Sequence, residues 1–380
     1  MEPLGNVTIE SVINSLNDGV YVCDLDRRIT YWSESATRIT GWRQEDVVGK
    51  HCSDNILCHI DKNGHHLCGK EFCPLHRSMV TDKFSKVSQF IYGQGASGQR
   101  IPMEVSVAPI RDDSGSVVGG VETFRDASTT VHDLERAKAI QQLAMEEDIP
   151  ESIPLTFTPH YISRDIVGGD YYAIKNLGDD QCGVVLADVM GHGIAAALYT
   201  MHLSSLWNQY HLLLKNPVEF LGRVNEELAT IIKEEGSFAT AVCGLLDWNK
   251  QLFRFASAGG PEVVLMHENG TYECLKGAGL PLGLMSAFDY EEFSCEFHPG
   301  DSLLLFSDGA VEIENADGKM LEIHGLIDIL KRQDYPKLKL QTETLAKALL
   351  KYSNSIFLED DLTIIEVRFQ RDGNYMENLG

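Results

Sequence analysis

Five aspartates between residues 170 and 361 of the 380-residue chain stand where carboxylates could gather around metal ions. Each lies where an apolar run meets a turn, in the segments VGGDYY, LADVMGHG, FSDGAVE and EDDLTII, and they are Asp170, Asp188, Asp308, Asp360 and Asp361. Ionised carboxylates held close together repel one another and need cations. Because the ligand atoms would all be oxygens, the expected ions are Mg²⁺ or Mn²⁺ rather than Zn²⁺.

The apolar runs beside these aspartates predict strands that would project the carboxylates at the mouth of a sheet. Glycines adjoin the aspartate in VGGDYY and FSDGAVE, and they follow it within a few residues in LADVMGHG. They let the backbone turn tightly and leave room for water. A single aspartate of this kind is most often an ordinary turn residue. Four such strand ends in one domain favour a common site, although their irregular spacing does not by itself bring them together.

The stretch from 151 to 372 predicts a domain of the α+β class, in which helices cover antiparallel sheets. Strand-like runs such as CGVVLADV, ATAVCGLLDW and LTIIEVRF occur there together with two helical stretches, at 195–214 and 217–235. Residues 1–127 predict a separate domain of short strands and turns. One of its strand pairs surrounds the turn at 24–27, and another surrounds the turn that begins at Asp112.

An insert rich in cysteine and histidine, residues 51–78, lies between these two strand pairs. Thiolates and imidazoles are ligands for Zn²⁺, for iron–sulfur clusters and for haem iron. The expected ligands are Cys52, Cys68 and Cys73 with either Cys58 or His59. The spacings between the cysteines match no C-x-x-C zinc knuckle. A thiol pair that senses oxidation and plain buried packing are the alternatives.

Residues 128–150 connect the two predicted domains. The segment 128–147 contains neither glycine nor proline, and residues such as Gln141 and Met145 recur on one face at helical spacing. We therefore expect a weakly amphipathic helix that ends before Pro150. It is either a plain linker or one half of a parallel coiled coil between two chains.

Composition excludes several classes of protein. The formal net charge of −24 argues against nucleic acid or an anionic membrane as the main partner. No apolar run is long enough for a transmembrane helix, and the first residues lack the basic and apolar regions of an export signal. We therefore expect a cytoplasmic protein whose nine cysteines are reduced thiols or ligands, not a disulfide framework.

A series of motifs in the larger domain resembles the metal-dependent protein serine/threonine phosphatases of the PPM (type 2C) class, in their SpoIIE-like bacterial branch. The motifs follow one another as VGGDYY, ADVMGHGIAAAL, RVNEEL, FATAV, ASAGGP, GLPLGL, GDSLLLFSDGAVE and DDLT. Any one of these motifs is a weak indication of the family, but eight of them in the same order are a specific one. The resemblance implies an α/β-β/α sandwich of two antiparallel sheets between helices, with a binuclear metal centre at one end.

The resemblance also implies roles for the aspartates. Asp188 would bridge two Mn²⁺ or Mg²⁺ ions, and the backbone carbonyl of Val189 would bind one of them. Asp308 and Asp360 would complete the second site, and Asp170 would hold metal-bound waters. The catalytic residues implied in this way are Asp170, Asp188 and Asp308.

Asp361 is a further candidate metal ligand, although it stands where the family has a polar neighbour that supports the site. A hydroxide between the two ions would attack phosphorus in line, without a phosphoenzyme intermediate. His192 is either a general acid or a structural part of its turn. Where relatives often read AGH-x-P, this chain has Ala258-Gly259-Gly260-Pro261, so a histidine is absent.

Residues 9–127 resemble a PAS sensor domain. The resemblance is carried by SLNDGVYVCDLDRRITYWSESATRITGW, by the VVGK turn and by PIRDDSGSVVGGVETFRDAS. It implies a five-stranded antiparallel sheet with helices that cradle a small ligand or cofactor. PAS domains commonly dimerise, so we expect a homodimer formed through this domain and the linker helix, with the helix as transmitter.

The two resemblances together imply a sensor-regulated phosphatase. The usual substrate in this branch is a phosphoserine or phosphothreonine on a STAS-domain anti-sigma-factor antagonist, within partner-switching control of a sigma factor. The helices over roughly 194–233 act in this branch as a switch that positions the metal site. The alternative is a non-catalytic PAS sensor of redox state or metal, whose phosphatase-like domain is a docking module.

Overall fold

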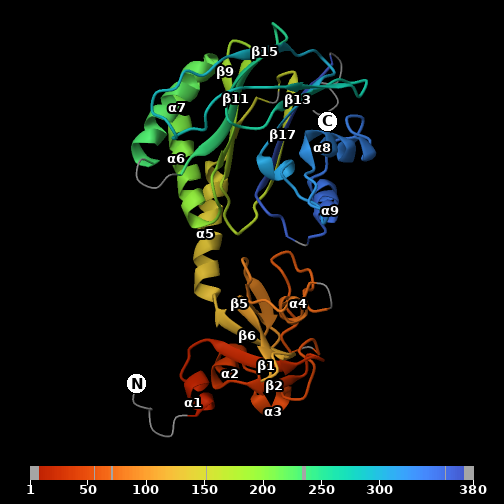
Figure 1. Cartoon of the computed structure of the whole chain (residues 1–380). Coiled ribbons are helices and arrows are strands. Elements are labelled where there is room, and N and C mark those ends of the chain that lie inside the picture. The colour runs from red at the N-terminus through yellow and green to blue at the C-terminus, as the bar shows by residue number, and fades with distance from the viewer. Residues whose placement is uncertain are drawn as a thin grey trace. The chain divides into compact units, whose positions relative to one another are not determined.

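The computed structural model describes residues 8–54, 56–69, 72–150, 152–232, 237–355 and 357–371 (Figure 1). Contacts within the chain divide it into two compact units, Met1–Asp133 and Leu134–Gly380. The division falls inside helix α5 (Ser128–Ala144). Each unit has its own sheets and its own buried side chains. Within the described ranges, no helix combines the length and the apolar character that crossing a membrane requires.

The first unit is built on a six-stranded antiparallel sheet in the order β2–β1–β6–β5–β3, with β4 also paired to β5. Its strands are β1 Gly19–Asp24, β2 Ile29–Trp32, β3 Ser85–Lys86, β4 Ile91–Gln94, β5 Arg100–Arg111 and β6 Val117–Asp126. Both predicted strand pairs are present, as β1 with β2 and β5 with β6. The sheet has one strand more than the PAS resemblance implies, because the short β3 and β4 both pair with the long β5.

Hydrogen bonds within the two predicted turns explain why these strands pair. The Asp24 carboxylate accepts the N–H of Arg28 at 2.8 Å, in the turn between β1 and β2. The Asp112 carboxylate accepts the N–H groups of Ser114 and Ser116 at 2.9 and 3.0 Å, between β5 and β6. Aspartates that bond to the backbone a few residues ahead favour such turns. Local chemistry therefore determines both hairpins.

Four α-helices lie wholly within the described part of the first unit: α1 Ile9–Asn14, α2 Glu34–Thr40, α3 Gln44–Val47 and α4 Pro74–Thr81. The cap of α2 is typical, since the Ser33 hydroxyl accepts the N–H of Ala36 and Gly41 ends the helix at φ +76°. The Cys/His-rich insert is partly helical, because α4 begins within it. Four of its apolar residues are at most 2% exposed, namely Ile56, Leu57, Leu67 and Leu75.

The second unit contains two sheets. The first runs β15–β12–β11–β10–β9–β7, and the second runs β14–β13–β16–β17–β8. The strands of the first sheet are β7 Glu146–Asp148, β9 Asp170–Gly178, β10 Gln181–Val189, β11 Ala239–Asp247, β12 Leu252–Ala258 and β15 Phe293–Glu296. Those of the second are β8 Leu155–Ile162, β13 Val263–Met266, β14 Tyr272–Leu275, β16 Ser302–Phe306 and β17 Leu362–Phe369.

Apolar side chains from both sheets of this unit form one core between them. Val184 of β10 and Phe253 of β12 belong to the same buried cluster as Leu303 of β16 and Ile365 of β17. Strands such as β10 and β17 are buried along almost their whole length. That is why they read as continuous apolar runs in the sequence instead of alternating ones.

Helices cover the outer face of each sheet, with α6 and α7 on one side and α8 and α9 on the other (Figure 1). These helices are α6 Ile194–Tyr210, α7 Pro217–Ile232, α8 Glu322–Arg332 and α9 Thr342–Ser353. Leu203 and Trp207 pack α6 onto the first sheet. Leu326 and Leu345 pack α8 and α9 onto the second. The predicted α+β class and its α/β-β/α layering are therefore confirmed.

The helix predicted over 128–147 ends earlier than expected. It stops at Ala144, and Glu146–Asp148 form β7, which pairs in parallel with Ala173–Lys175 of β9. The prediction was wrong at this end because pairing with an open sheet edge outweighs the helical preference of a short segment.

Candidate metal centre

Asp170 and Asp188 stand side by side at one end of the first sheet. Asp170 is the first residue of β9, Asp188 is the last but one of β10, and the antiparallel register pairs them directly. Val189 follows and donates its N–H to the carbonyl of Gly169 at 3.1 Å. The β9–β10 hairpin therefore brings together two of the predicted carboxylates and the predicted carbonyl.

Asp308, Asp360 and Asp361 gather at one end of the second sheet. Asp308 opens the 3₁₀ turn η2 (Asp308–Ala310) just after β16, and Asp361 immediately precedes β17. These two strands pair antiparallel, so the end of one adjoins the start of the other. Gly309 permits the close approach, because a Cβ there would lie 2.0 Å from the carbonyl oxygen of Asp361.

Hydrogen bonds join the two sheet ends to each other. The Thr363 hydroxyl, at the start of β17, donates to the Asp170 carboxylate on β9. The Asp361 carboxylate accepts the N–H of Gly169 on one oxygen and that of Arg164, at 2.6 Å, on the other. Both oxygens of Asp361 thus accept hydrogen bonds from the segment that leads into Asp170.

The aspartates at this end carry concentrated negative charge. Burial raises the pKa of Asp188 to about 10, and the charges of Asp170 and Asp308 add to the increase. Burial and the charge of Asp361 hold the pKa of Asp170 well above its usual range, and burial also raises the pKa of Asp360. Carboxyl groups in this situation keep their protons unless cations offset their charge.

The donor atoms fit hard divalent ions. The Oδ1 atom of Asp170 is buried and has no hydrogen-bond partner among the described residues, a costly state that a cation or its water would relieve. The other donors are carboxylate oxygens and a backbone carbonyl, the set that Mg²⁺ and Mn²⁺ prefer. Across the described ranges, however, no three His, Cys, Asp or Glu side chains already surround one ion-binding point. The individual ligand roles therefore stay predictions.

The turn after β10 presents a histidine near these aspartates. Gly191 and Gly193 adopt φ values of +91° and +81°, a region that favours glycine. Between them, His192 Nδ1 lies 2.8 Å from Asp165 Oδ2. Sequence reasoning missed Asp165, because no strand end or glycine turn marks it as it marks the other aspartates.

A buried glutamine of α5 contacts the same region. Gln141 Nε2 donates to the carbonyl of Gly168 at 2.7 Å and to Thr200 Oγ1 of α6 at 2.8 Å, and its Oε1 accepts the N–H of Gly168 at 3.2 Å. Gln141 is only 4% exposed. The one signal in the sequence was a polar residue on the apolar face of the predicted helix.

All nine cysteines of the chain are free thiols, among them the predicted ligands Cys52, Cys58, Cys68 and Cys73. Cys52 and Cys73 are buried, and Cys58 and Cys68 are partly buried. The Cys68 sulfur accepts the N–H of His59 at 3.1 Å, and burial raises the pKa of Cys68 to about 12. Burial and the neighbouring Cys73 raise the pKa of Cys52 as well. Thiols that keep their protons behave as packing groups unless a metal displaces the proton, and the ligand set stays a prediction.

A pair of titratable side chains is buried between the insert and the PAS sheet. His59 Nε2 lies 3.5 Å from Glu122 Oε1, and the Tyr21 hydroxyl donates to Glu122 Oε2 at 3.0 Å. Burial raises the pKa of Glu122 to about 8 and lowers the pKa of His59 to about 4. Both side chains are therefore mainly uncharged at pH 7. Tyr21 and Glu122 were not predicted, because strand patterning marks core positions without showing what they face.

Comparison with known families agrees with this arrangement. Residues 178–370, half of the chain, match the family described as Stage II sporulation protein E (SpoIIE), and residues 17–129 match the PAS domain. The chain therefore belongs to the SpoIIE family and carries a PAS domain ahead of its SpoIIE domain.

Two relatives from Bacillus subtilis (strain 168) are similar over part of their length. Phosphoserine phosphatase RsbP is 26% identical over 186 residues, which are 48% of this chain and 46% of RsbP. Phosphoserine phosphatase RsbU is 26% identical over 237 residues, which are 62% of this chain and 70% of RsbU. The chain thus spans less than half the length of RsbP.

A solved structure shares the fold of the second unit. The SiaA-PP2C domain of Pseudomonas aeruginosa has a TM-score of 0.54 and 23% sequence identity, covering 64% of this chain and 99% of that domain. At this level of identity the likeness concerns the fold, and it agrees with the two-sheet sandwich described above.

Proposed function

We propose that this chain is a metal-dependent protein serine/threonine phosphatase regulated by its PAS domain. The observation that carries the proposal is the gathering of five aspartates at strand ends of two packed sheets. Burial and the charges of neighbouring carboxylates raise the pKa values of four of them, which are Asp170, Asp188, Asp360 and Asp361. Membership of the SpoIIE family and likeness to two phosphoserine phosphatases support the same reaction.

Two Mn²⁺ or Mg²⁺ ions would be held by Asp188, Asp308, Asp360 and the carbonyl of Val189. Bound ions of this kind activate water for attack on phosphorus and neutralise charge on the phosphoryl oxygens. The residues of the chain itself hold the groups of the centre in position. Thr363 orients Asp170 by donating to its carboxylate, and Asp361 holds the backbone of Gly169. Asp170 would then hold the waters bound at the centre.

The substrate we propose is a phosphoserine or phosphothreonine on a STAS-domain anti-sigma-factor antagonist, within a partner-switching system. The names of RsbP and RsbU as phosphoserine phosphatases support this class of substrate. We also propose that the chain works as a homodimer through its PAS domain and α5. The contact of Gln141 with Gly168 supports α5 as the route of the signal.

For the sensor, we propose that the insert binds Zn²⁺, an iron–sulfur cluster or haem through Cys52, Cys68 and Cys73 with Cys58 or His59. Elemental analysis and an absorption spectrum of anaerobically purified protein test this. Colour with iron indicates a cluster or haem, and colourless protein with zinc indicates Zn²⁺. Protein without metal would reject the ligand set and leave thiol chemistry.

The phosphatase reaction itself is tested by a matched pair of variants in the full chain. Asp188→Asn should lower Mn²⁺-dependent hydrolysis of p-nitrophenyl phosphate and of a phosphoserine peptide by about a hundredfold or more. Asp328→Asn changes an exposed aspartate on α8 and should leave the rate unchanged. Wild-type protein that binds Mn²⁺ and a phosphoprotein but hydrolyses neither substrate would instead be the non-catalytic docking module.

A further inference from the structure

A cavity of about 590 Å³ opens beside the candidate metal centre. Asp308 belongs both to the centre and to the lining of the cavity. Thr240 also lines the cavity, and it pairs with Asp188 in the register of β10 and β11. A phosphoryl group held at the centre would therefore place the residues next to it in the substrate over this cavity.

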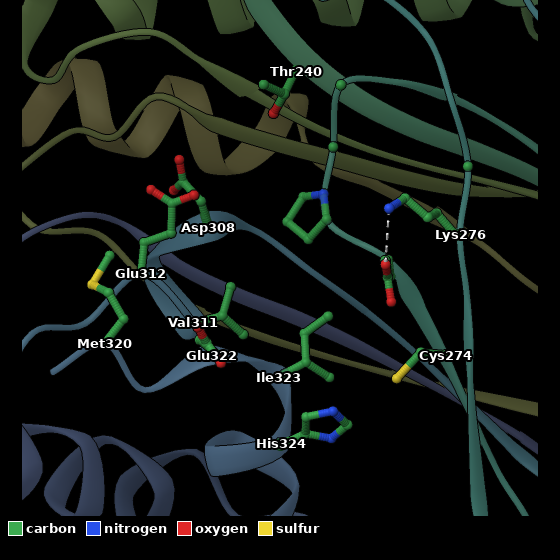
Figure 2. A pocket seen from close by; sticks show the side chains of 15 residues that line it. Thr240, Cys274, Lys276, Asp308, Val311, Glu312, Met320, Glu322, Ile323 and His324 are labelled. Carbon is green, nitrogen blue, oxygen red and sulfur yellow. Dashed lines mark ion pairs between the residues drawn. The ribbon is translucent and has the colours of Figure 1, made fainter.

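Two walls of folded backbone shape the cavity (Figure 2). One wall is the segment from Val311 to Ile323, in which the N–H of Glu322 donates to the carbonyl of Val311 at 3.0 Å. The other wall stands at the start of β13 and the end of β14, where Lys276 and Glu262 form an ion pair at 4.0 Å. Because backbone pairing holds both walls, the cavity exists before any substrate binds.

The lining of the cavity is negatively charged. It has the carboxylates of Glu262, Asp308, Glu312 and Glu322 against the single ammonium of Lys276. Figure 2 shows Asp308 and Glu312 across the cavity from Lys276. Among the described residues of the lining, Lys276 forms an ion pair with Glu262. The Mn²⁺ or Mg²⁺ ions of the proposed centre would neutralise Asp308. Glu312 and Glu322 are left to attract an incoming cation.

The same lining has an apolar part, formed by Pro261, Val311, Met320 and Ile323. Long basic side chains bury their hydrocarbon stems and keep their charge at a polar end. A lysine or arginine therefore matches this mixture of apolar and acidic groups. An acidic side chain would be repelled, and a purely apolar one would bring hydrocarbon against carboxylates.

Resting on the proposed phosphatase function, we propose that this cavity is a specificity pocket for a lysine or arginine of the phosphoprotein substrate, a few residues away from the phosphorylated serine or threonine. Glu312 and Glu322 recognise the positive charge, and the apolar lining receives the stem of the side chain. Substrates with a basic residue at that position are then hydrolysed faster than the same substrates with a neutral or acidic residue.

The test uses the full chain with Mn²⁺ and a set of phosphoserine peptides in which one lysine is moved along the sequence on either side of the phosphoserine. Peptides with alanine or glutamate at the same positions give the comparison, and kcat/KM is measured by phosphate release. At one position or more, lysine should raise kcat/KM about fivefold over alanine, and glutamate should lower it. Glu322→Lys should abolish or reverse this order, and Glu322→Gln should weaken it.

Glu314→Lys is the matched control, since it makes the same charge change in the same segment but lies outside the lining of the cavity. Hydrolysis of p-nitrophenyl phosphate, which carries no basic side chain, should stay within about twofold of the wild-type rate in Glu314→Lys. Equal effects of Glu322→Lys and Glu314→Lys, or no preference for lysine, would overturn the pocket. Failure of the wild type to hydrolyse p-nitrophenyl phosphate would instead overturn the phosphatase function.

Discussion

Gln141 and Gly168 hold each other through two hydrogen bonds, one in each direction. The amide nitrogen of Gln141 donates to the Gly168 carbonyl, and the Gly168 N–H donates to the amide oxygen. The same amide nitrogen donates to the hydroxyl of Thr200 on α6. Since Gly168 stands two residues before Asp170, one side chain ties two helices to the segment that carries a predicted catalytic residue.

We expect Gln141→Met to weaken the metal centre. The change leaves the N–H and C=O of Gly168 buried without these partners, which costs about 1–3 kcal/mol. Asp170 then loses part of its positioning, and the Mn²⁺ concentration for half-maximal activity should rise about tenfold. Gln142→Met alters the exposed neighbour and should have no effect. An unchanged Mn²⁺ requirement in Gln141→Met would limit Gln141 to a role in stability.

The pair of Glu122 and His59 predicts how the stability of the PAS unit depends on pH. The pKa of Glu122 is raised from 4.5 to about 8, so its contribution is fully present below about pH 4.5 and is lost as the pH rises towards 8. The pKa of His59 is lowered from 6.5 to about 4, so its contribution is present above 6.5 and is lost as the pH falls towards 4. Of the two, only Glu122 titrates between pH 6.5 and 8, and stability should fall there.

Glu122→Gln imitates the protonated acid and should flatten this decrease. Thermal unfolding of the full chain at several pH values between 6.5 and 8 measures the effect. Glu104→Gln, at an exposed position of β5, is the matched control and should keep the wild-type slope. An equal slope in wild type and Glu122→Gln would show that Glu122 is already ionised in the folded chain.

The aspartates could be predicted from the sequence because their signals are local. An aspartate at the point where an apolar run meets a turn can be recognised without knowing the fold. Their convergence could not be predicted from spacing, since Asp170 and Thr363 meet across 193 residues of sequence. Which two strand ends adjoin depends on how the sheets pack, and only the ordered motifs of the family supplied that information.

The residues that sequence reasoning missed depend on partners in other elements. Gln141 reads as one polar residue in a helix until Gly168 is placed beside it, and Glu122 reads as an ordinary strand residue until His59 covers it. The strand β7 was missed for a similar reason. Three residues carry too little pattern, and only the edge of β9 makes them a strand.

Gly309 should not tolerate a side chain. An added Cβ would lie 2.0 Å from the Asp361 carbonyl oxygen, a backbone atom that cannot rotate away. Gly309→Ala should therefore lower the free energy of unfolding by about 2–3 kcal/mol and remove most Mn²⁺-dependent activity. Gly222→Ala, in α7 where an added Cβ meets nothing within 4 Å, should raise that free energy by up to about 1 kcal/mol. Urea unfolding measures both, and wild-type stability of Gly309→Ala would contradict the close approach.

Asp361→Asn should separate support of the site from ligation of the ions. Asparagine keeps one acceptor oxygen and turns its amide N–H₂ towards the N–H of either Arg164 or Gly169. Activity should fall about 10–100-fold, while two Mn²⁺ ions per chain still bind at saturation. Asp360→Asn should lose one of the two ions. Metal content after equilibrium dialysis checks both variants, and loss of an ion from Asp361→Asn would make Asp361 a ligand.

Only Met145 separates the last residue of α5 from the first residue of β7. That strand is hydrogen-bonded to β9, which begins at Asp170. A strand that is hydrogen-bonded to its neighbour cannot slide or turn without breaking those hydrogen bonds. The junction between α5 and β7 therefore allows little independent movement of the two elements. A rotation of α5 about its own axis would therefore twist the edge of the sheet, whereas a longer linker would absorb the rotation.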